Sequence, residues 1–405
     1  MKASLGQSIL VTWENGPDWR HLMRLKPIVE RLAERGHRLT LVARDLSQTQ
    51  KVFPDLACLQ PPQQPRPVRA HPQAGSLAEI MLNSGFDNSA TVKRLCAAWQ
   101  AIGELVRPDA VVMSFSPVAL LAFQGQPIRQ VLIDDGYSHP MASGRMPSLK
   151  PWQRRYADQQ TGIESRVRKA VNDVLLEAGQ PPIDELSELF QRVDSINLMT
   201  LPELDHSGPK AHAHYRGFSD PGGAPPPWPG PATRPRLFVY LRPFAGIGEL
   251  LSRIGQLDWS ILAIVPGHDP QLRERLSNRP NLHLTETPCD IYRAAREAQL
   301  GISAGGDTVG IMLLGATPVC IVPYHVEQYL SAWRAEKTGA AICAGTPARL
   351  PPRTEEIITA LNQLAQNRDC RQQAGAFAAR YQALDPEHEL AAVVAEIEGG
   401  SPDCP

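Results

Sequence analysis

The sequence has no long apolar run, no excess of charge of either sign and no clustered cysteines. Its 41 lysines and arginines nearly balance its 42 aspartates and glutamates, so the formal net charge is −1 and there is no basic field for a nucleic acid. No apolar run approaches the roughly 20 residues that cross a bilayer. The seven cysteines are scattered, without a CxxC pair or a histidine at metal-ligand spacing, which argues against a disulfide framework and a structural zinc site. The first residues show no cleavable signal pattern, so we expect a soluble, cytoplasmic protein without a metal.

The length of the chain and its alternating pattern predict two α/β domains. At 405 residues the chain exceeds what one hydrophobic core usually supports. An apolar strand at 8–13 precedes a helix at 22–34, whose apolar residues recur at helical spacing, and a strand at 38–43 follows. This alternation predicts a parallel, doubly wound sheet. Further strands are expected at 110–113, 129–133 and 196–200, and helices at 76–82, 90–106 and 164–178.

A stretch rich in proline and glycine divides the pattern. Residues 219–231 contain too much of both for a helix or a strand, so we expect a linker at 218–235. This linker would join a first domain at 1–217 to a second at 236–384, with a C-terminal helix and tail at 385–405. Ligands of open α/β sheets bind beyond the carboxyl ends of the strands, so we expect a cleft between the domains. The second half predicts strands at 236–241, 260–265, 298–303 and 318–322, and helices at 248–256, 270–276, 354–366, 369–382 and 387–398.

One segment of the second half has the pattern of a binding site. The strand at 298–303 opens into a turn with Gly305 and Gly306, and the strand at 318–322 leads to Glu327 and Gln328 in a loop. Glycine lets backbone N–H groups approach an anion, and a helix start adds positive dipole, so the turn suits a diphosphate. The acid–amide pair suits the hydroxyls of a sugar. The alternative interpretation is an ordinary turn between a strand and a helix.

Two more residues follow predicted strands. His21 follows a polar loop and opens a helix, where its neutral form can act as a general base; the alternative is a surface histidine. Arg242 ends the strand at 236–241 and can pair with a diphosphate in fork geometry; the alternative is a solvated arginine.

These segments carry a resemblance to a known family. The loop at 14–21 is similar to a glycine-rich strand–loop–helix that ends in histidine, residues 35–37 read Arg-Gly-His, and Asp109 stands where "PDxVV" strands begin. Residues 303–328 resemble the signature "HxGxGT…GxP…P…[DE]Q". Together they resemble the GT-B nucleotide-sugar glycosyltransferases, in the bacterial branch related to the UDP-glucuronosyl, flavonoid and macrolide enzymes. The resemblance covers both domains.

The resemblance implies a fold and a set of roles. It implies two Rossmann-like parallel-sheet domains that face a cleft, with C-terminal helices packing back toward the first domain. It implies a nucleotide-diphosphate sugar as substrate, with no cofactor and no metal, and His21 as the base that activates the acceptor. The implied donor-binding residues are Ser303, Gly305, Gly306, Thr308, Glu327 and Gln328, with Arg242 added by its position, and the acceptor loop includes Asn15, Gly16 and Ser114.

The sequence departs from the family pattern at three positions. The signature histidine is replaced by Ser303, and a later glycine by Asp307, whose carboxylate repels a diphosphate unless it points away. The acidic partner that orients the base is replaced by Ser114, which leaves the tautomer of His21 less controlled. Asp134 and Asp135, after another strand, are candidates to replace it.

Three functions fit these residues. The first is a metal-independent, inverting glycosyltransferase that acts on a hydroxyl of a small-molecule or natural-product acceptor. The second is a catalytically weak or inactive protein that binds a nucleotide or glycan as a partner or regulator, which the three departures favour. The third, ranked last, is a sugar-nucleotide 2-epimerase. Residues 61–74 and 137–152 are candidate acceptor-shaping segments or plain surface loops.

Overall fold

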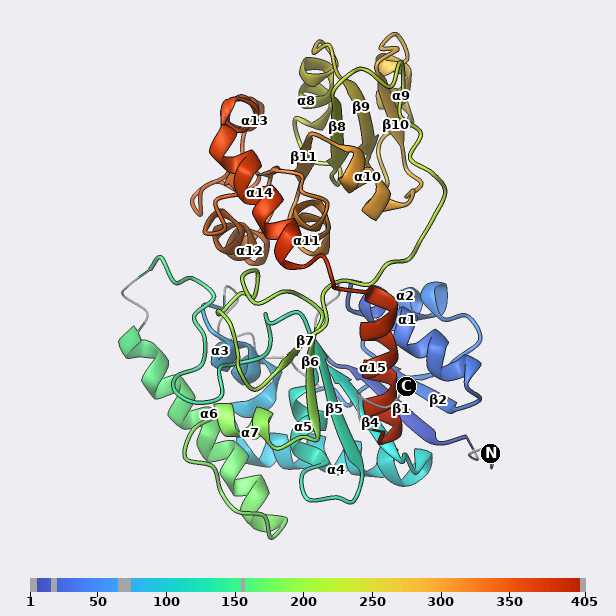
Figure 1. The fold of residues 1–405 in the computed structure, drawn as a ribbon. Coiled ribbons are helices and arrows are strands. Elements are labelled where there is room, and N and C mark those ends of the chain that lie inside the picture. The colour runs from blue at the N-terminus through green and yellow to red at the C-terminus, as the bar shows by residue number, and fades with distance from the viewer. Residues whose placement is uncertain (1–5, 16–19, 65–73, 154–156, 401–405) are drawn as a thin grey trace. The chain divides into compact units, whose positions relative to one another are not determined.

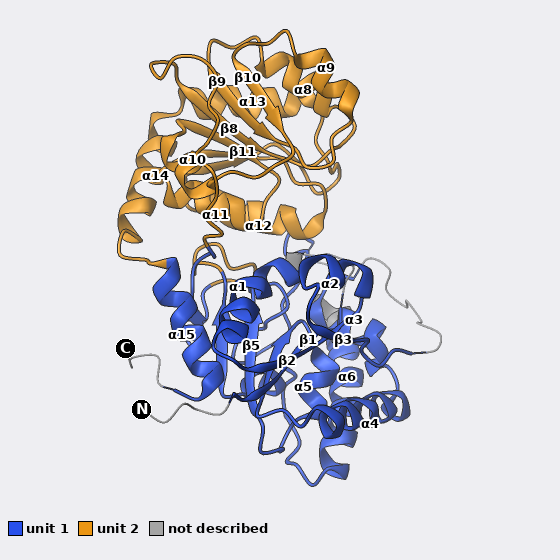
Figure 2. Ribbon diagram, turned by 90° about the vertical axis from the view of Figure 1, so that its right-hand side faces the viewer, with its two compact units in different colours: residues 1–199, 209–219, 386–405 blue, residues 200–208, 220–385 orange. Residues whose placement is uncertain are grey.

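The computed structural model describes residues 6–15, 20–64, 74–153 and 157–400. The chain divides into two compact units, coloured separately in Figure 2: unit 1 comprises residues 1–199, 209–219 and 386–405, and unit 2 comprises residues 200–208 and 220–385. Each unit contains one parallel sheet accompanied by helices, which confirms the prediction of two Rossmann-like domains. Within the described ranges, no helix is both long and apolar enough to cross a membrane.

Unit 1 is built on a seven-stranded sheet in the order β3-β2-β1-β4-β5-β6-β7 (Figure 1). Its inner strand β1 (Ser8–Trp13) is buried along its whole length, as expected for a strand covered on both faces. β1 pairs with β4 (Ala110–Ser114) in a register that sets Trp13 beside Ser114 at the carboxyl end. The other strands are β2 (Arg38–Ala43), β3 (Ala57–Leu59), β5 (Arg129–Asp134), β6 (Ser195–Leu198) and β7 (His214–Tyr215).

The helices of unit 1 follow the predicted alternation. α1 (Arg20–Glu34) buries Leu22, Leu25 and Ile28, the apolar stripe expected from its spacing. The helix expected at 76–82 ends earlier and continues as a π-helical turn, η1 (Leu82–Phe86), in which Gly85 takes a φ of 110°. The remaining helices are α2 (Leu46–Val52), α3 (Leu77–Met81), α4 (Ser89–Val106), α5 (Pro117–Ala122), α6 (Ala157–Glu177) and α7 (Ser187–Gln191).

The C-terminal helix α15 (Pro386–Glu398) belongs to unit 1, although residues 220–385 lie in unit 2. Its apolar residues Val393, Val394 and Ile397 are fully buried and join the core around β1 and α1. On its polar side, Arg216 pairs with Glu389 and Glu396. The predicted return of the C-terminal helix to the first domain is therefore confirmed.

Unit 2 contains a six-stranded sheet in the order β10-β9-β8-β11-β12-β13. The register sets Ser303, at the end of β11 (Leu300–Ser303), beside Tyr240 of β8 (Arg236–Tyr240) and Ile321 of β12 (Val319–Ile321). The loops that follow these three strands therefore leave the sheet at one edge. The other strands are β9 (Ser260–Ile264), β10 (Leu282–Thr285) and β13 (Ala341–Cys343), and the helices are α8 (Ile247–Ile254), α9 (Pro270–Leu276), α10 (Ile291–Glu297), α11 (Asp307–Leu314), α12 (Val326–Glu336), α13 (Thr354–Gln366) and α14 (Arg368–Arg380).

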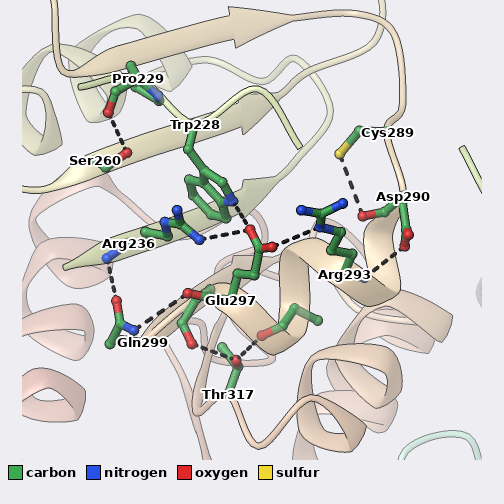
Figure 3. Close-up of polar contacts among 12 residues, drawn as sticks. Trp228, Pro229, Arg236, Ser260, Cys289, Asp290, Arg293, Glu297, Gln299 and Thr317 are labelled. Atoms are coloured by element: carbon green, nitrogen blue, oxygen red, sulfur yellow. Dashed lines mark hydrogen bonds and ion pairs between the residues drawn. The ribbon is translucent and has the colours of Figure 1, made fainter. Parts of the chain in front are cut away.

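The segment expected to link the domains is irregular, and it is fixed to unit 2. Figure 3 shows Trp228, whose indole N–H donates to Glu297 over 2.7 Å, while Arg236 pairs with the same carboxylate at 2.8 Å. The Arg236 guanidinium also lies over the Trp228 ring, 5.1 Å from its centroid. Ser260 Oγ donates to the carbonyl of Pro229. The segment around Trp228 is thus fixed to α10 and to the first residues of β8 and β9.

The observed units also differ from the predicted first domain at 1–217, because part of that range lies in unit 2. Residues 200–208 belong to unit 2. Glu203 explains this placement, because its carboxylate binds Arg380 and the Tyr381 hydroxyl of unit 2.

Candidate active site

In unit 1, the carboxyl ends of β1 and β4 bring His21 and Ser114 together. His21 lies in the first turn of α1, and Ser114 is the last residue of β4. His21 Nδ1 is 3.2 Å from Ser114 Oγ, and Ser114 is fully buried. Because a hydroxyl both donates and accepts, Ser114 can bind either tautomer of the ring. Ser114 is therefore a polar partner of the His21 Nδ1 atom.

Two aromatic rings pack against the same imidazole. The Trp13 ring is stacked on His21 with centroids 5.8 Å apart and an interplanar angle of 23°. The Phe115 ring is stacked on His21 at 6.0 Å and 27°. Phe115 is one of three non-glycine residues with positive φ in the described chain, at 47°, which turns the chain sharply after β4.

A buried carboxylate supports this turn. Glu14, after β1, accepts hydrogen bonds from the backbone N–H groups of Val118 (2.9 Å) and Ala119 (2.7 Å) at the start of α5. Its own N–H donates to Ser116 Oγ over 3.2 Å. Burial raises the pKa of Glu14 to about 7, against the lowering effect of these bonds. Glu14 thus joins the end of β1 to the segment after β4.

Asp134, the candidate substitute for the missing carboxylate, is held by its own turn. Its Oδ1 accepts from the backbone N–H groups of Gly136 (2.7 Å) and Ser138 (3.2 Å), and its Oδ2 accepts from the Ser138 hydroxyl. Burial, followed by the charge of Asp135, raises the pKa of Asp134 to about 6. Asp134 therefore stabilises its own turn, whereas Ser114 contacts the His21 ring.

The predicted acceptor loop is described in part. Asn15 is buried, and its Oδ1 accepts from Ser84 Oγ over 3.1 Å. Gly16 lies outside the described residues.

In unit 2, the glycine turn after β11 has the backbone conformation that its sequence predicts. Gly305 and Gly306 have φ values of 131° and 68°, which side chains disfavour. Gly306 precedes α11, and no side chain caps the first N–H groups of this helix, which include that of Thr308. Ser303 is buried, and its Oγ accepts from the Gly305 N–H at 3.4 Å.

Glu327 and Gln328 lie in the first turn of α12, not in the loop that the sequence predicts. The helix begins at Val326, because no glycine or proline interrupts the chain after Pro323. Gln328 is buried, and its Oε1 accepts from the Tyr324 N–H over 2.8 Å.

Arg242 is exposed at the end of β8, and its backbone is anchored. The Tyr324 hydroxyl accepts from the Arg242 N–H (3.1 Å) and donates to the Arg242 carbonyl (3.0 Å). The Tyr324 ring also packs against Phe244, with centroids 5.5 Å apart. One phenol therefore ties the loop after β8 to the loop after β12.

Asp307 is the first residue of α11, where a carboxylate interacts favourably with the helix dipole. The pKa of the Tyr292 phenol in α10 is raised chiefly by burial, then by the charge of Asp220, and to a smaller extent by the charge of Asp307.

Comparisons with known proteins agree with this architecture. No model of a known protein family matches the chain. In sequence, the chain is 26% identical over 333 residues to a PGL/p-HBAD biosynthesis glycosyltransferase of Mycobacterium tuberculosis, covering 76% of this chain and 75% of that one. In structure, it is similar to CalG4, the calicheamicin glycosyltransferase, with a TM-score of 0.66 and 18% identity over 97% of this chain and 98% of that one. It is also similar to the spinosyn rhamnosyltransferase SpnG in complex with the spinosyn aglycone, with a TM-score of 0.64 and 17% identity over 95% and 98%.

The chain therefore has the GT-B fold of these glycosyltransferases. Within this fold, the residues predicted from the sequence fall into two groups at the carboxyl edges of the two sheets. His21 and Ser114 meet in unit 1. In unit 2, Gly305 lies beside Gln328, since a Cβ at position 305 would be 3.2 Å from Gln328 Cβ.

Sequence reasoning missed four residues that belong to these two groups. Trp13 and Phe115 stack on His21, and the Tyr324 hydroxyl binds the backbone of Arg242. Glu14 supports the turn that follows β4. Glu14 directly precedes the predicted Asn15, so its position was a usable signal. The other three depend on tertiary contacts that no periodicity records.

Proposed function

We propose that this glycosyltransferase moves a sugar from a nucleoside-diphosphate donor to a hydroxyl of a natural-product acceptor, with inversion at C1 of the sugar. The observation that carries the proposal is the placement of His21 at the carboxyl edge of the first sheet, with its Nδ1 bonded to Ser114 Oγ. We assign Nε2 of the same ring to the proton of the acceptor hydroxyl.

The proposed reaction is a single displacement. The acceptor hydroxyl gives its proton to His21 while its oxygen attacks C1 of the sugar. The bond from C1 to the phosphate oxygen breaks, and its electron pair leaves on the nucleoside diphosphate. Because attack and departure occur on opposite faces, the configuration at C1 is inverted.

We propose that the donor binds at the edge of the second sheet. The N–H groups at the start of α11, the Thr308 hydroxyl and the Arg242 guanidinium would hold the diphosphate, and Ser303 would add a hydroxyl group. Glu327 and Gln328 would bind the sugar hydroxyls. These groups supply the positive charge that the leaving diphosphate needs, so no metal is proposed. SpnG, a structural neighbour, has been solved with thymidine diphosphate, which supports a donor of this class.

The acceptor is proposed to bind in unit 1. A small, mostly apolar cavity lies beside Phe115 and is lined also by Met113, Leu132, Asp134 and His139. Burial, with the charges of Lys210 and His212, lowers the pKa of His139 well below its ordinary value, so this lining is neutral at that position. The cavity itself has a volume of about 20 Å³, enough for a water-sized group only, so an apolar scaffold would contact its wall and not enter it. The neighbours' titles name calicheamicin and a spinosyn aglycone, which supports a natural-product acceptor.

The test compares His21→Ala with His214→Ala, an exposed histidine in the same unit that serves as the control. Release of nucleoside diphosphate is measured with TDP-glucose and UDP-glucose, with and without a panel of phenolic and macrolide acceptors. We expect His21→Ala to lose about 10²- to 10⁴-fold of the transfer rate, as removal of a general base does, and to keep its thermal shift with TDP or UDP. Equal transfer rates in the two variants would show that His21 is not the general base.

A second candidate function is nucleotide binding without transfer. Asp307 in the first turn of α11 and Ser303 in place of a histidine favour it, because both weaken the attraction of the site for phosphate. This function gains support if the wild-type protein transfers no sugar from any donor while TDP or UDP still raises its melting temperature.

A further inference from the structure

His139 is a buried histidine of unit 1 that the proposed reaction does not use. Strand β5 ends at Asp134, whose carboxylate accepts the N–H of Ser138 over 3.2 Å, and His139 directly follows this turn. His139 is only 1% exposed. Its ring meets that of Phe190 in α7 edge-on, with centroids 6.0 Å apart and an interplanar angle of 82°. The turn after β5 and the Phe190 ring therefore position this imidazole.

One nitrogen of the His139 ring has a protein partner and the other does not. His139 Nε2 lies 3.2 Å from Nε2 of His212, so one of the two rings donates a hydrogen bond to the other. Within the described part of the chain, no hydrogen bond reaches His139 Nδ1. Burial lowers the pKa of His139 well below its ordinary value, so the ring is neutral and has one donor and one acceptor nitrogen. Because a buried polar atom without a partner costs free energy, a partner for Nδ1 would stabilise the site.

The cavity that His139 lines has room for such a partner. The cavity has a volume of about 20 Å³, and one water molecule needs about 10–15 Å³. The hydroxyl groups in its lining already donate to the protein: that of Ser138 donates to Asp134. That of Ser116 donates to the Ser114 carbonyl over 3.1 Å. The rest of the lining is mostly apolar and includes Leu77, Met113, Leu132 and Phe190. The cavity therefore fits one hydroxyl group, and the scaffold that carries the hydroxyl stays outside.

The cavity lies next to the proposed base and does not include it. Phe115 lines the cavity, and its ring packs against that of His21 with centroids 6.0 Å apart. His21 is not among the described residues that line the cavity. A group bound here is therefore not the hydroxyl that His21 would deprotonate, and it would belong to another part of the same acceptor.

We propose that His139 is a specificity-determining residue that binds a second hydroxyl of the acceptor through Nδ1. The inference rests on the proposed function, in which the acceptor binds in unit 1. A hydroxyl fits better than a carbonyl oxygen, because it both donates and accepts and so pairs with either tautomer of the ring. It fits better than a carboxylate, because the neutral ring offers no charge and the cavity already contains the carboxyl group of Asp134.

Three variants of His139 separate its two nitrogens. His139→Asn keeps a polar atom on Cγ, where Nδ1 is attached, and loses Nε2. His139→Gln places its polar atoms one bond further out, toward the position of Nε2, and loses the atom at Nδ1. His139→Phe removes both nitrogens and keeps a ring against Phe190. If His139 only bonds His212, glutamine should replace it best, whereas the proposal expects asparagine to do so.

The kinetic test measures transfer from TDP-glucose and UDP-glucose to pairs of acceptors that differ by one hydroxyl, such as apigenin and chrysin. One hydrogen bond changes an equilibrium about five-fold, so the wild type should prefer the hydroxylated member of a pair by about five-fold in kcat/KM. His139→Asn should keep this preference, and His139→Gln and His139→Phe should lose it. The loss should appear in the acceptor KM and not in kcat, because the bond is remote from the reacting carbon.

A binding test does not depend on transfer. The Nδ1 resonance of ¹⁵N-labelled His139 is followed by NMR during titration with phenol and with toluene, which has a methyl group in place of the hydroxyl. The spectrum of His139→Phe assigns the resonance. We expect phenol to shift it and toluene to leave it unchanged. Equal responses to the two compounds would overturn the proposal, as would a wild-type preference that glutamine keeps and asparagine loses.

The inference and the proposed function fail separately. If His21→Ala loses transfer while no wild-type preference depends on His139, the base remains supported and the His139 proposal is wrong. If the wild type transfers no sugar to any acceptor, the proposed function is wrong, and the NMR titration alone decides whether His139 binds a hydroxyl.

Discussion

The backbone of Gly305 lies directly against the side chain of Gln328. A Cβ at position 305 would lie 3.2 Å from Cβ and 3.3 Å from Cγ of Gln328. This close approach joins the turn after β11 to the first turn of α12. The two ends of the segment that we assign to the donor are therefore in contact, although 22 residues lie between them in the sequence.

Gly305→Ala should weaken donor binding. The new methyl group would crowd Gln328, and a φ of 131° is one that side chains rarely adopt. We therefore expect the donor-binding conformation of this turn to be strained by about 1–3 kcal/mol. The measurement is the melting temperature with and without TDP, together with the donor KM. Gly267→Ala is the control, because Gly267 also has positive φ, at 75°, and has no atom within 4 Å of the added Cβ. Equal losses of donor binding in both variants would assign the effect to the backbone alone.

The fold was predictable from the sequence because its strands are continuous apolar runs. The bounds of β1 and β2 agree with those expected, since both strands are long and flanked by polar loops. The strands β3, β7 and β13, of two or three residues each, were not predicted.

The site was predictable only where a residue type marks it. Glycine at 305 permits a backbone that other residues disfavour, and histidine at 21 titrates near neutral pH, so the sequence makes both of them candidates. The role of Phe115 depends on a left-handed backbone, and that of Tyr324 on a hydrogen bond to a loop 82 positions away. Neither property leaves a pattern in the sequence.

Tyr324→Phe should raise the donor KM with little change in kcat. The variant keeps the packing against Phe244 and loses the hydroxyl that holds the Arg242 backbone. A single hydrogen bond contributes about 1 kcal/mol, so we expect a rise of about five-fold. Steady-state kinetics with varied donor measures it. Tyr381→Phe loses a hydroxyl bonded to Glu203 in the same unit and should leave the donor KM as it is. A drop in kcat alone for Tyr324→Phe would contradict the assignment.

Thr308→Val tests whether the first turn of α11 binds the diphosphate. Valine keeps the shape of threonine and removes the hydroxyl, so we expect a loss of about 1–3 kcal/mol in kcat/KM for the donor if that hydroxyl bonds phosphate. The control is Thr359→Val, whose hydroxyl bonds the Glu355 carbonyl on α13. Unchanged kinetics in Thr308→Val would place the phosphates elsewhere in unit 2.

Glu14 should make unit 1 less stable as the pH rises. Its pKa in the folded protein is about 7, above the ordinary value of 4.5, so the folded state binds the proton more tightly than the unfolded chain does. The stability that this proton contributes is complete below pH 4.5 and is lost as the pH rises through 7. At pH 8 the loss would reach about 3 kcal/mol.

Glu14→Gln removes this titration, so the variant should gain stability relative to the wild type between pH 5 and pH 8. The amide introduces an N–H group near the backbone donors of Val118 and Ala119, and that cost does not depend on pH. The quantity to measure is therefore the change with pH in the difference between variant and wild type, by urea unfolding. Glu104→Gln, at an exposed position on α4, should show no such change. A pH-independent difference for Glu14→Gln would mean that the carboxylate is already ionised in the folded protein at pH 5.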